Sequence, residues 1–329
     1  YHLTMAQAWF ADGKANETKT SECFFRKSPF KGNYLLSAGL AEFSEWLENW
    51  HISDKDVKYL QSLKNADGSR RFNDDFLSFI KEQPLQISID AVEEGEVVFP
   101  NEPIYSITGP TWQVEVVEAA LLNIFNSQSL IATKASRIVQ AACSDGKQRP
   151  VLEFGVRRGQ ELGGFSATRA CFIGGMSGTS NVAAAQHYDI PVSGTMAHSF
   201  IMSYEDETDA YKAYLKASSG NTTLLVDTYE TRQGIKNAIK ASQETAIPLQ
   251  GIRIDSGDLA YWSKEARQIL DDAGFSDTKI IGSNDLDEYS IAKLVEQGAP
   301  YDIFAAGTKL VTAYDCPALG GVFKTKRYN

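Results

Sequence analysis

Charged, hydroxyl and glycine residues follow short apolar runs at regular intervals in the second half of the chain. Two early runs, residues 151–154 and 190–193, lead into an arginine pair and a histidine-containing turn. The residues that follow the successive runs are Arg157 and Arg158, Thr195 and His198, Asp227, Asp255 and Asp258, Gly282 and Ser283, and Gly307 and Thr308. If the runs are parallel strands, their carboxyl ends share one rim and these residues meet in one site.

Two of these turns, Gly282-Ser283 and Gly307-Thr308, have the composition of phosphate-binding turns. Glycine lets the backbone approach a phosphate, the hydroxyl donates a hydrogen bond, and a following helix offers free N–H groups. The alternative is ordinary turn and cap chemistry. Their recurrence on successive units favours the phosphate interpretation.

Arg157-Arg158 is suited to a phosphate or pyrophosphate, because a guanidinium matches such oxygens in bidentate fashion. The alternative is a surface ion pair. The pair comes directly after an apolar, strand-like run, which favours binding.

Asp255 and Asp258 place two carboxylates one turn apart. They suit a Mg²⁺ ion that carries a phosphorylated substrate, because Mg²⁺ takes few protein ligands and keeps phosphate and water oxygens. The alternative is that Ser256 or Asp258 caps a helix beginning at Leu259.

His198 lies just past a strand-like run, within a Gly-Thr-x-x-His-Ser turn. Its imidazole could act as a nucleophile, a base or a phosphate acceptor. A structural role is the alternative, and the sequence pattern alone does not separate the two.

Alternating strands and helices must position these residues. Strand-like runs begin near residues 151, 190, 222, 251, 279, 302 and 321, and helical stretches span 180–187, 205–216, 232–242, 259–273 and 285–296. Such alternation predicts a parallel sheet with right-handed crossovers. About seven units suit a closed or nearly closed α/β barrel better than a short open sheet.

The first part of the chain lacks this regular alternation of strands and helices. Residues 36–50 have helical spacing, Ser53 and Asp56 form a candidate helix start, and three short β-rich pieces follow between 87 and 107. We therefore expect a small α+β domain over residues 1–109 and a catalytic barrel over 110–329, joined by two helices within 111–142.

Composition narrows the function classes. The chain has 329 residues, and 32 basic against 42 acidic side chains give a net charge of −10. Such a protein is a poor general binder of nucleic acid, so an anionic ligand needs a local basic pocket. Four separated cysteines indicate a reducing cytoplasm, and no apolar run reaches the about 18 residues of a membrane span.

The ordered motifs resemble the nicotinate phosphoribosyltransferase family over nearly the whole length. They are Tyr1-His2-Leu3-Thr4-Met5, Phe99-Pro100-Asn101-Glu102-Pro103, Glu153-Phe154-Gly155-Val156-Arg157-Arg158, Gly178-Thr179-Ser180-Asn181-Val182, Gly194-Thr195-Met196-Ala197-His198-Ser199, Gly251-Ile252-Arg253-Ile254-Asp255-Ser256-Gly257-Asp258, Ser283-Asn284-Asp285-Leu286-Asp287-Glu288 and Gly307-Thr308. Residues 159–164 depart from the commoner family form, Ala-Gln-Gly-Pro-Asp-Gly.

The resemblance implies an irregular TIM-like α/β barrel of the type II phosphoribosyltransferase kind, with a smaller N-terminal α+β domain. It implies a cytoplasmic homodimer with a shared active site. It also implies phosphoribosyl transfer to nicotinate in NAD salvage, coupled to ATP hydrolysis. His198 matches the histidine that ATP phosphorylates, with Asp255 as a further catalytic residue. Tyr1, Thr195 and Arg253 match the nicotinate contacts.

The remaining assignments concern the sugar pyrophosphate. Arg157, Arg158, Gly282, Ser283, Gly307 and Thr308 are expected to bind phosphoribosyl pyrophosphate, and Asp255 and Asp258 to bind Mg²⁺. Three alternatives stay open: nicotinamide as the acceptor, a barrel lyase with Lys309 as a Schiff-base lysine, and a non-catalytic sensor of phosphoribosyl metabolites.

Overall fold

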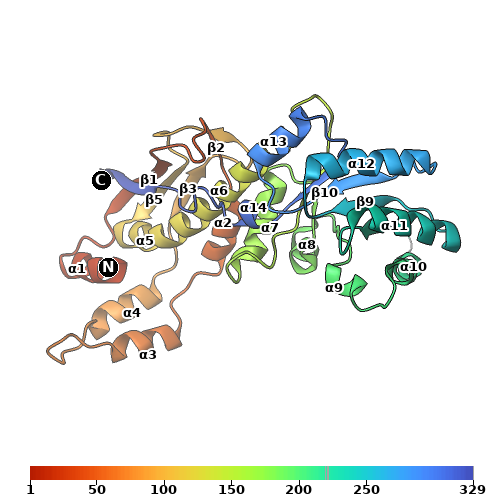
Figure 1. The fold of residues 1–329 in the computed structure, drawn as a ribbon. Coiled ribbons are helices and arrows are strands. Elements are labelled where there is room, and N and C mark those ends of the chain that lie inside the picture. Colours follow the sequence, from red (N-terminus) through yellow and green to blue (C-terminus); the bar gives the residue numbers. More distant parts are fainter. Residues whose placement is uncertain (219, 221, 329) are drawn as a thin grey trace. The chain divides into compact units, whose positions relative to one another are not determined.

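The computed structural model describes residues 1–218, 220 and 222–328. The chain forms two compact units (Figure 1). One contains Tyr1–Leu130 and the segment from Ala318 onward, and the other is Ile131–Pro317. Among the described residues, none of the helices has both the length and the apolar character needed to cross a membrane.

The first unit contains a four-stranded antiparallel sheet in the order β12-β1-β5-β3. Its strands are β1 (Thr18–Phe25), β3 (Ser88–Ala91), β5 (Tyr105–Pro110) and β12 (Gly321–Tyr328), and a separate pair joins β2 (Leu35–Leu36) to β4 (Val97–Val98). Every second residue of β1 is buried, as a strand with one core-facing side requires.

Helices of the first unit are α1 (His2–Ala11), α2 (Leu40–Glu48), α3 (Asp54–Ser62), α4 (Asp74–Glu82) and α5 (Thr111–Val116); α6 (Glu118–Ala142) runs from this unit into the second. The expected helix start at Ser53 is confirmed, because Ser53 and Asp56 form a reciprocal capping box. The two helices expected within 111–142 are also confirmed.

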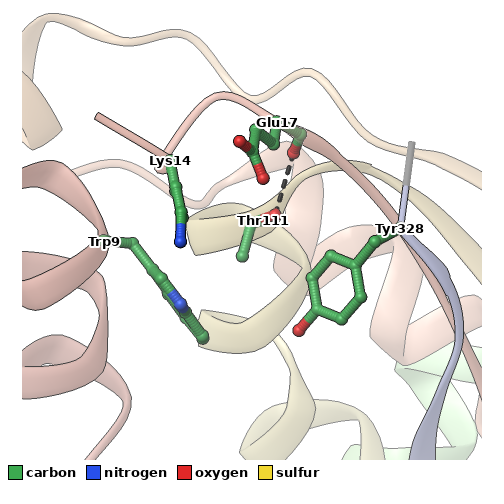
Figure 2. A pocket seen from close by; sticks show the side chains of 5 residues that line it. All are labelled: Trp9, Lys14, Glu17, Thr111 and Tyr328. Atoms are coloured by element: carbon green, nitrogen blue, oxygen red, sulfur yellow. Dashed lines mark hydrogen bonds between the residues drawn. The ribbon is translucent and has the colours of Figure 1, made fainter. Parts of the chain in front are cut away.

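A small cavity of the first unit is lined by Trp9, Lys14, Glu17, Thr111 and Tyr328 (Figure 2). Its volume is about 270 Å³. Lys14 pairs with Asp12 at 2.9 Å, and the Thr111 hydroxyl donates to the Glu17 carbonyl oxygen at 2.9 Å. These polar groups are therefore engaged within the protein.

The second unit is built on a curled six-stranded parallel sheet in the order β7-β6-β11-β10-β9-β8. The strands are β6 (Val151–Glu153), β7 (Gly178–Thr179), β8 (Thr223–Leu225), β9 (Gly251–Ile254), β10 (Lys279–Gly282) and β11 (Ile303–Ala306). The helices are α7 (Gly163–Ile173), α8 (Val182–Tyr188), α9 (His198–Ile201), α10 (Glu207–Ala217), α11 (Thr231–Thr245), α12 (Leu259–Asp272), α13 (Glu288–Glu296) and α14 (Thr308–Val311). In Figure 1, α11 and α12 cover β9 and β10.

The segment after Ile190 lies between the two edge strands of this sheet. Val192 bridges Thr179 of β7 in parallel, and the Leu225 N–H of β8 lies 3.2 Å from the Met196 sulfur. The sheet therefore curls into an irregular, nearly closed barrel. The expected full strand at residue 190 is reduced to a single bridge because Pro191 lacks an N–H and Gly194 follows closely.

The run beginning at Gly321 is not a barrel strand. It forms β12, which pairs antiparallel with β1 in the first unit. Local alternation predicts a strand but not its partner, and here the partner lies about 300 residues away in sequence. The compact units also divide after Leu130, whereas the sequence-based boundary is at residues 109–110.

Candidate active site

The carboxyl ends of the second unit's strands surround a cavity of about 490 Å³. Its lining residues come from β9 and β11, from the segments that follow β6, β7, β9, β10 and β11, and from the segment after Ile190. They include Phe154, Arg157, Arg158, Ser180, Thr195, Arg253, Asp255, Ser283, Asn284, Asp285, Gly307 and Thr308. This is the rim where α/β barrels place their functional residues.

Arg253 is the most buried cation of this cavity, with a side chain 13% exposed. Its Nη1 donates to the Thr195 hydroxyl at 2.5 Å, and its Nη2 lies 4.0 Å from the Asp255 carboxylate. Among the residues that the structure describes, none makes a hydrogen bond to its buried Nε. Burial lowers the pKa of this guanidinium, while Asp255 and Asp227 act in the opposite direction. An arginine remains charged under such shifts, so the cavity contains a cation with free donor capacity.

Asp255 lies at the centre of the polar contacts. One carboxylate oxygen accepts the Ser283 hydroxyl at 2.5 Å, and the other lies 3.7 Å from Nε2 of His198. Its backbone N–H donates to buried Asp227 at 2.8 Å. Asp227, which follows β8, thus fixes the start of the loop after β9.

His198 begins α9 beside this cavity, although it is not among the lining residues given above. Its Nδ1 lies 3.1 Å from the Thr228 hydroxyl, which fixes the ring from one side. Its Nε2 faces Asp255, and the side chain is 40% exposed. One ring nitrogen is therefore engaged by a hydroxyl, while the other faces a carboxylate and solvent.

The two glycine turns differ from each other. Gly307 and Thr308 both line the cavity, and Thr308 begins α14. Ser283 lines it as well, but Gly282 is buried and does not. A Cβ at Gly282 would lie 2.9 Å from the Tyr301 ring. Glycine at 282 is needed for packing rather than for the approach of a ligand.

Arg157 and Arg158, from the loop after β6, also line the cavity. Arg157 is close enough to Arg253 to lower its pKa further. Two guanidinium groups near one another disfavour an empty cavity and favour an anion between them.

Asp258 occupies a different position from Asp255. It is the N-cap of α12, and its carboxylate accepts the Tyr261 N–H at 3.1 Å. The capping alternative is therefore confirmed for this residue. Asp285, which the sequence analysis did not single out, is an exposed carboxylate that lines the cavity.

Phe154 and Ser180 also line the cavity, and neither was predicted from the sequence. Each directly follows the end of a parallel strand, which was the signal available. The Phe154 ring lies 6.0 Å from the Arg253 guanidinium carbon. Tyr1, by contrast, belongs to the first unit and is 76% exposed, so its assignment stays a prediction.

Lys309 was the candidate Schiff-base lysine. Its ammonium donates to the Asp287 carboxylate at 2.8 Å. The hydrogen bond to Asp287 is the main cause that raises the pKa of Lys309. A Schiff-base lysine needs a lowered pKa, so this ion pair contradicts that alternative.

Together, the curled parallel sheet and its cationic, hydroxyl-rich rim define a class: α/β-barrel proteins that bind an anionic substrate at the carboxyl ends of the strands. Sequence comparison identifies the family. Residues 1–126 match the nicotinate phosphoribosyltransferase N-terminal domain, and residues 150–326 match the nicotinate phosphoribosyltransferase family. The chain belongs to the nicotinate phosphoribosyltransferase family.

Individual relatives agree with this result. The chain is 44% identical to the nicotinate phosphoribosyltransferase of Bacillus subtilis, across 98% of the chain and 65% of that protein. It is 38% identical to pncB2 of Mycobacterium tuberculosis, across the whole chain and 69% of that protein. The chain thus spans about two thirds of the length of these relatives.

Solved structures show the same architecture. Human nicotinic acid phosphoribosyltransferase superposes with a TM-score of 0.86 at 27% identity, covering the whole chain and 74% of the human one. A nicotinate-nucleotide pyrophosphorylase from Pyrococcus furiosus has a TM-score of 0.76 at 22% identity, covering the whole chain and 76% of that structure. The second likeness concerns the fold alone.

Proposed function

We propose that this protein transfers a phosphoribosyl group from phosphoribosyl pyrophosphate to nicotinate, giving nicotinate mononucleotide and pyrophosphate in NAD salvage. The observation that carries the proposal is the single cavity in which Arg253 and Thr195 lie with Arg157, Arg158 and Thr308. A pyridine carboxylate and a sugar pyrophosphate both need cationic and hydroxyl donors, and this cavity supplies two sets of them.

In the proposed reaction, the pyridine nitrogen attacks C1 of the ribosyl group. The C1–O bond to pyrophosphate breaks, and its electron pair leaves with pyrophosphate. The positive charge that develops on the sugar ends on the pyridinium ring, so no proton transfer is needed. The protein positions both reactants and stabilises charge.

Arg253 and Thr195 would bind the nicotinate carboxylate. A guanidinium gains a charge-assisted pair with a carboxylate and gains nothing equivalent with a carboxamide, which favours nicotinate over nicotinamide. The Phe154 ring, close to Arg253, would lie against the pyridine face. Tyr1, donated by the partner subunit of a homodimer, would cover its other face.

Arg157 and Arg158 would bind the pyrophosphate, while Ser283, Gly307 and Thr308 would bind the 5-phosphate side. Gly282 would support its turn through packing rather than contact. This arrangement would place C1 between the two anionic ends of the sugar. Each guanidinium would also stabilise the charge that grows on the leaving group.

The carboxylates of this cavity fit a Mg²⁺ ion. Asp255 and Asp285 both line it, and one Asp255 oxygen points away from Ser283 toward His198. Hard oxygen ligands of this kind are what Mg²⁺ prefers, and bound Mg²⁺ neutralises part of the pyrophosphate charge. Asp258, which caps α12, would contribute only through water.

ATP coupling would proceed through His198. With Nδ1–H donating to Thr228, the Nε2 lone pair is free to attack the γ-phosphorus of ATP. The bond between that phosphorus and its bridging oxygen breaks, and ADP leaves. Water later hydrolyses the phosphohistidine to inorganic phosphate. The Thr228 hydroxyl would orient the ring, and Asp255, 3.7 Å from Nε2, would stabilise the positive charge that the ring gains as Nε2 attacks.

One assay separates the candidate functions. The purified protein is incubated with phosphoribosyl pyrophosphate, Mg²⁺ and either nicotinate or nicotinamide, with and without ATP, and the mononucleotide is measured. We expect turnover with the acid and stimulation by ATP. Turnover with the amide alone would support the nicotinamide alternative, and binding without turnover would support a metabolite sensor. Gel filtration of the same purified protein would test whether it forms a homodimer.

A further inference from the structure

Glu153 ends β6 directly before the loop that contains Arg157 and Arg158, and its side chain is fully buried. Its carboxylate accepts three hydrogen bonds from uncharged donors. One oxygen accepts the Gly155 N–H. The other accepts the Thr168 hydroxyl at 3.0 Å and the Thr179 hydroxyl at 2.5 Å.

Asn181 contacts both threonine hydroxyls of this network. Asn181 donates its backbone N–H to the Thr179 hydroxyl oxygen at 2.9 Å and its amide to the Thr168 hydroxyl oxygen at 3.4 Å. The Thr179 hydroxyl therefore accepts from Asn181 and donates to Glu153, while the Thr168 hydroxyl lies 3.0 Å from Glu153 and 3.4 Å from the Gly164 carbonyl oxygen. Both oxygens of residue 153 face donors, so an amide there would direct its NH2 group either at the Gly155 N–H or at the two hydroxyls.

These four residues join segments that are distant in the sequence. Thr168 lies on α7, Thr179 on β7, and Asn181 caps α8. The loop after β6 packs closely against its surroundings as well. A Cβ at Gly155 would lie 2.4 Å from the Val311 side chain, and one at Gly159 would lie 2.4 Å from Gly164.

We propose that Glu153 is a positioning residue, which fixes the Arg157–Arg158 turn for a pyrophosphate group through Gly155. The inference rests on the proposed function for the identity of the ligand. Glu153 is fully buried, so it acts through the turn and not by contact with the ligand. In this role the carboxylate holds the turn in the one geometry in which Arg157 and Arg158 both line the cavity.

The nicotinate side of the cavity is supported differently. Arg253 lies within β9, which pairs with β8 and β10. The Phe154 N–H donates to the Ala306 carbonyl oxygen of β11 at 2.8 Å, so the sheet fixes this residue independently of the Glu153 side chain. Loss of the carboxylate should therefore weaken pyrophosphate binding selectively.

The test compares Glu153→Gln with the wild type by calorimetric titration with inorganic pyrophosphate plus Mg²⁺ and, separately, with nicotinate. We expect pyrophosphate affinity to fall about tenfold, which is the size of change that loss of a buried hydrogen bond produces. Nicotinate affinity should change less than about twofold, because its contacts do not depend on the Glu153 side chain. The KM for phosphoribosyl pyrophosphate should rise in parallel.

A matched pair at Thr179 covers the case in which Glu153→Gln fails to fold. Thr179→Val removes the hydroxyl at nearly constant volume and should weaken pyrophosphate binding. Thr179→Ser keeps the hydroxyl and should bind as the wild type does. Unchanged pyrophosphate affinity in Glu153→Gln and Thr179→Val, or equal loss of both ligands, would overturn the proposal.

Hydrogen exchange of the unliganded protein separates this inference from the proposed function. If Glu153 positions the turn, the amides of residues 155–159 exchange faster in Thr179→Val than in Thr179→Ser, whatever ligand the protein binds. Unchanged exchange there would overturn the positioning role. Failure of the wild type to bind pyrophosphate, with faster exchange in the variant, would instead contradict only the proposed ligand.

Discussion

The guanidinium of Arg253 contacts the hydroxyl of Thr195, although the two residues are 58 positions apart. Arg253 comes from β9, and Thr195 comes from the segment that lies between the sheet edges β7 and β8. This contact brings the irregular part of the barrel to the cationic centre of the cavity. The segment that closes the barrel therefore also supplies a hydrogen-bond partner of Arg253 in the cavity.

Arg253→Ala should raise the KM for nicotinate by about 100-fold or more and the KM for phosphoribosyl pyrophosphate far less. A charge-assisted pair in a largely buried setting accounts for a change of this size. Steady-state kinetics with each substrate varied in turn measures both values. Arg253→Lys is the control, since it keeps the charge but not the bidentate geometry. Equal effects on both substrates would contradict the contact.

His198→Ala should remove stimulation by ATP and leave part of the basal transfer. Thr228→Val should reduce stimulation less, because it removes only the hydrogen bond that orients Nδ1. Rates with and without ATP, together with acid-labile phosphate on the protein, measure the effect. A His198→Ala protein that ATP still stimulates as strongly as the wild type would defeat the assignment.

Asp285→Asn should raise the Mg²⁺ concentration required for half-maximal activity, because it removes a carboxylate from the cavity. Asp258→Ala should instead lower stability by about 1 kcal/mol through loss of the α12 N-cap. Asp258→Asn, which can still cap, is its control. A strong shift in Mg²⁺ requirement for Asp258→Asn would restore Asp258 as a direct ligand.

Lys309→Met should lower stability by about 1 kcal/mol near neutral pH, since it removes the partly exposed ion pair with Asp287. Burial raises the pKa of Asp287, but hydrogen bonds from Lys309 and Ser290 outweigh this effect, so the pKa of Asp287 is lowered overall. The stabilisation from a lowered carboxyl pKa is present above its unfolded value of about 4 and disappears as pH falls through the folded value.

The difference in melting temperature between wild type and Lys309→Met should therefore be constant from about pH 5 to 8 and shrink below about pH 4. Asp287→Asn should show the same loss at neutral pH. Borohydride with a carbonyl substrate should not trap a covalent adduct at Lys309. A trapped adduct would reinstate the lyase alternative.

Much of the site followed from local sequence. Parallel strands must end on one rim, so Arg157, Asp255, Ser283 and Thr308 could be placed in one cavity from their positions after apolar runs. The helix starts at Ser53 and Asp258 were also readable, because a cap depends on residues within a single turn. Long-range strand pairing could not be predicted from local sequence. The strand beginning at Gly321 was expected in the barrel, but it pairs with β1 in the first unit.

The sequence by itself determined the succession of strands and helices and the polar residues at the strand ends, because these depend on short-range periodicity and backbone preference. Only the tertiary structure decided that Gly282 packs under Tyr301, that Lys309 pairs with Asp287, and that Glu153 lies beneath the arginine turn. Such contacts depend on how separate segments pack against one another. Local sequence patterns do not indicate which distant side chains will meet.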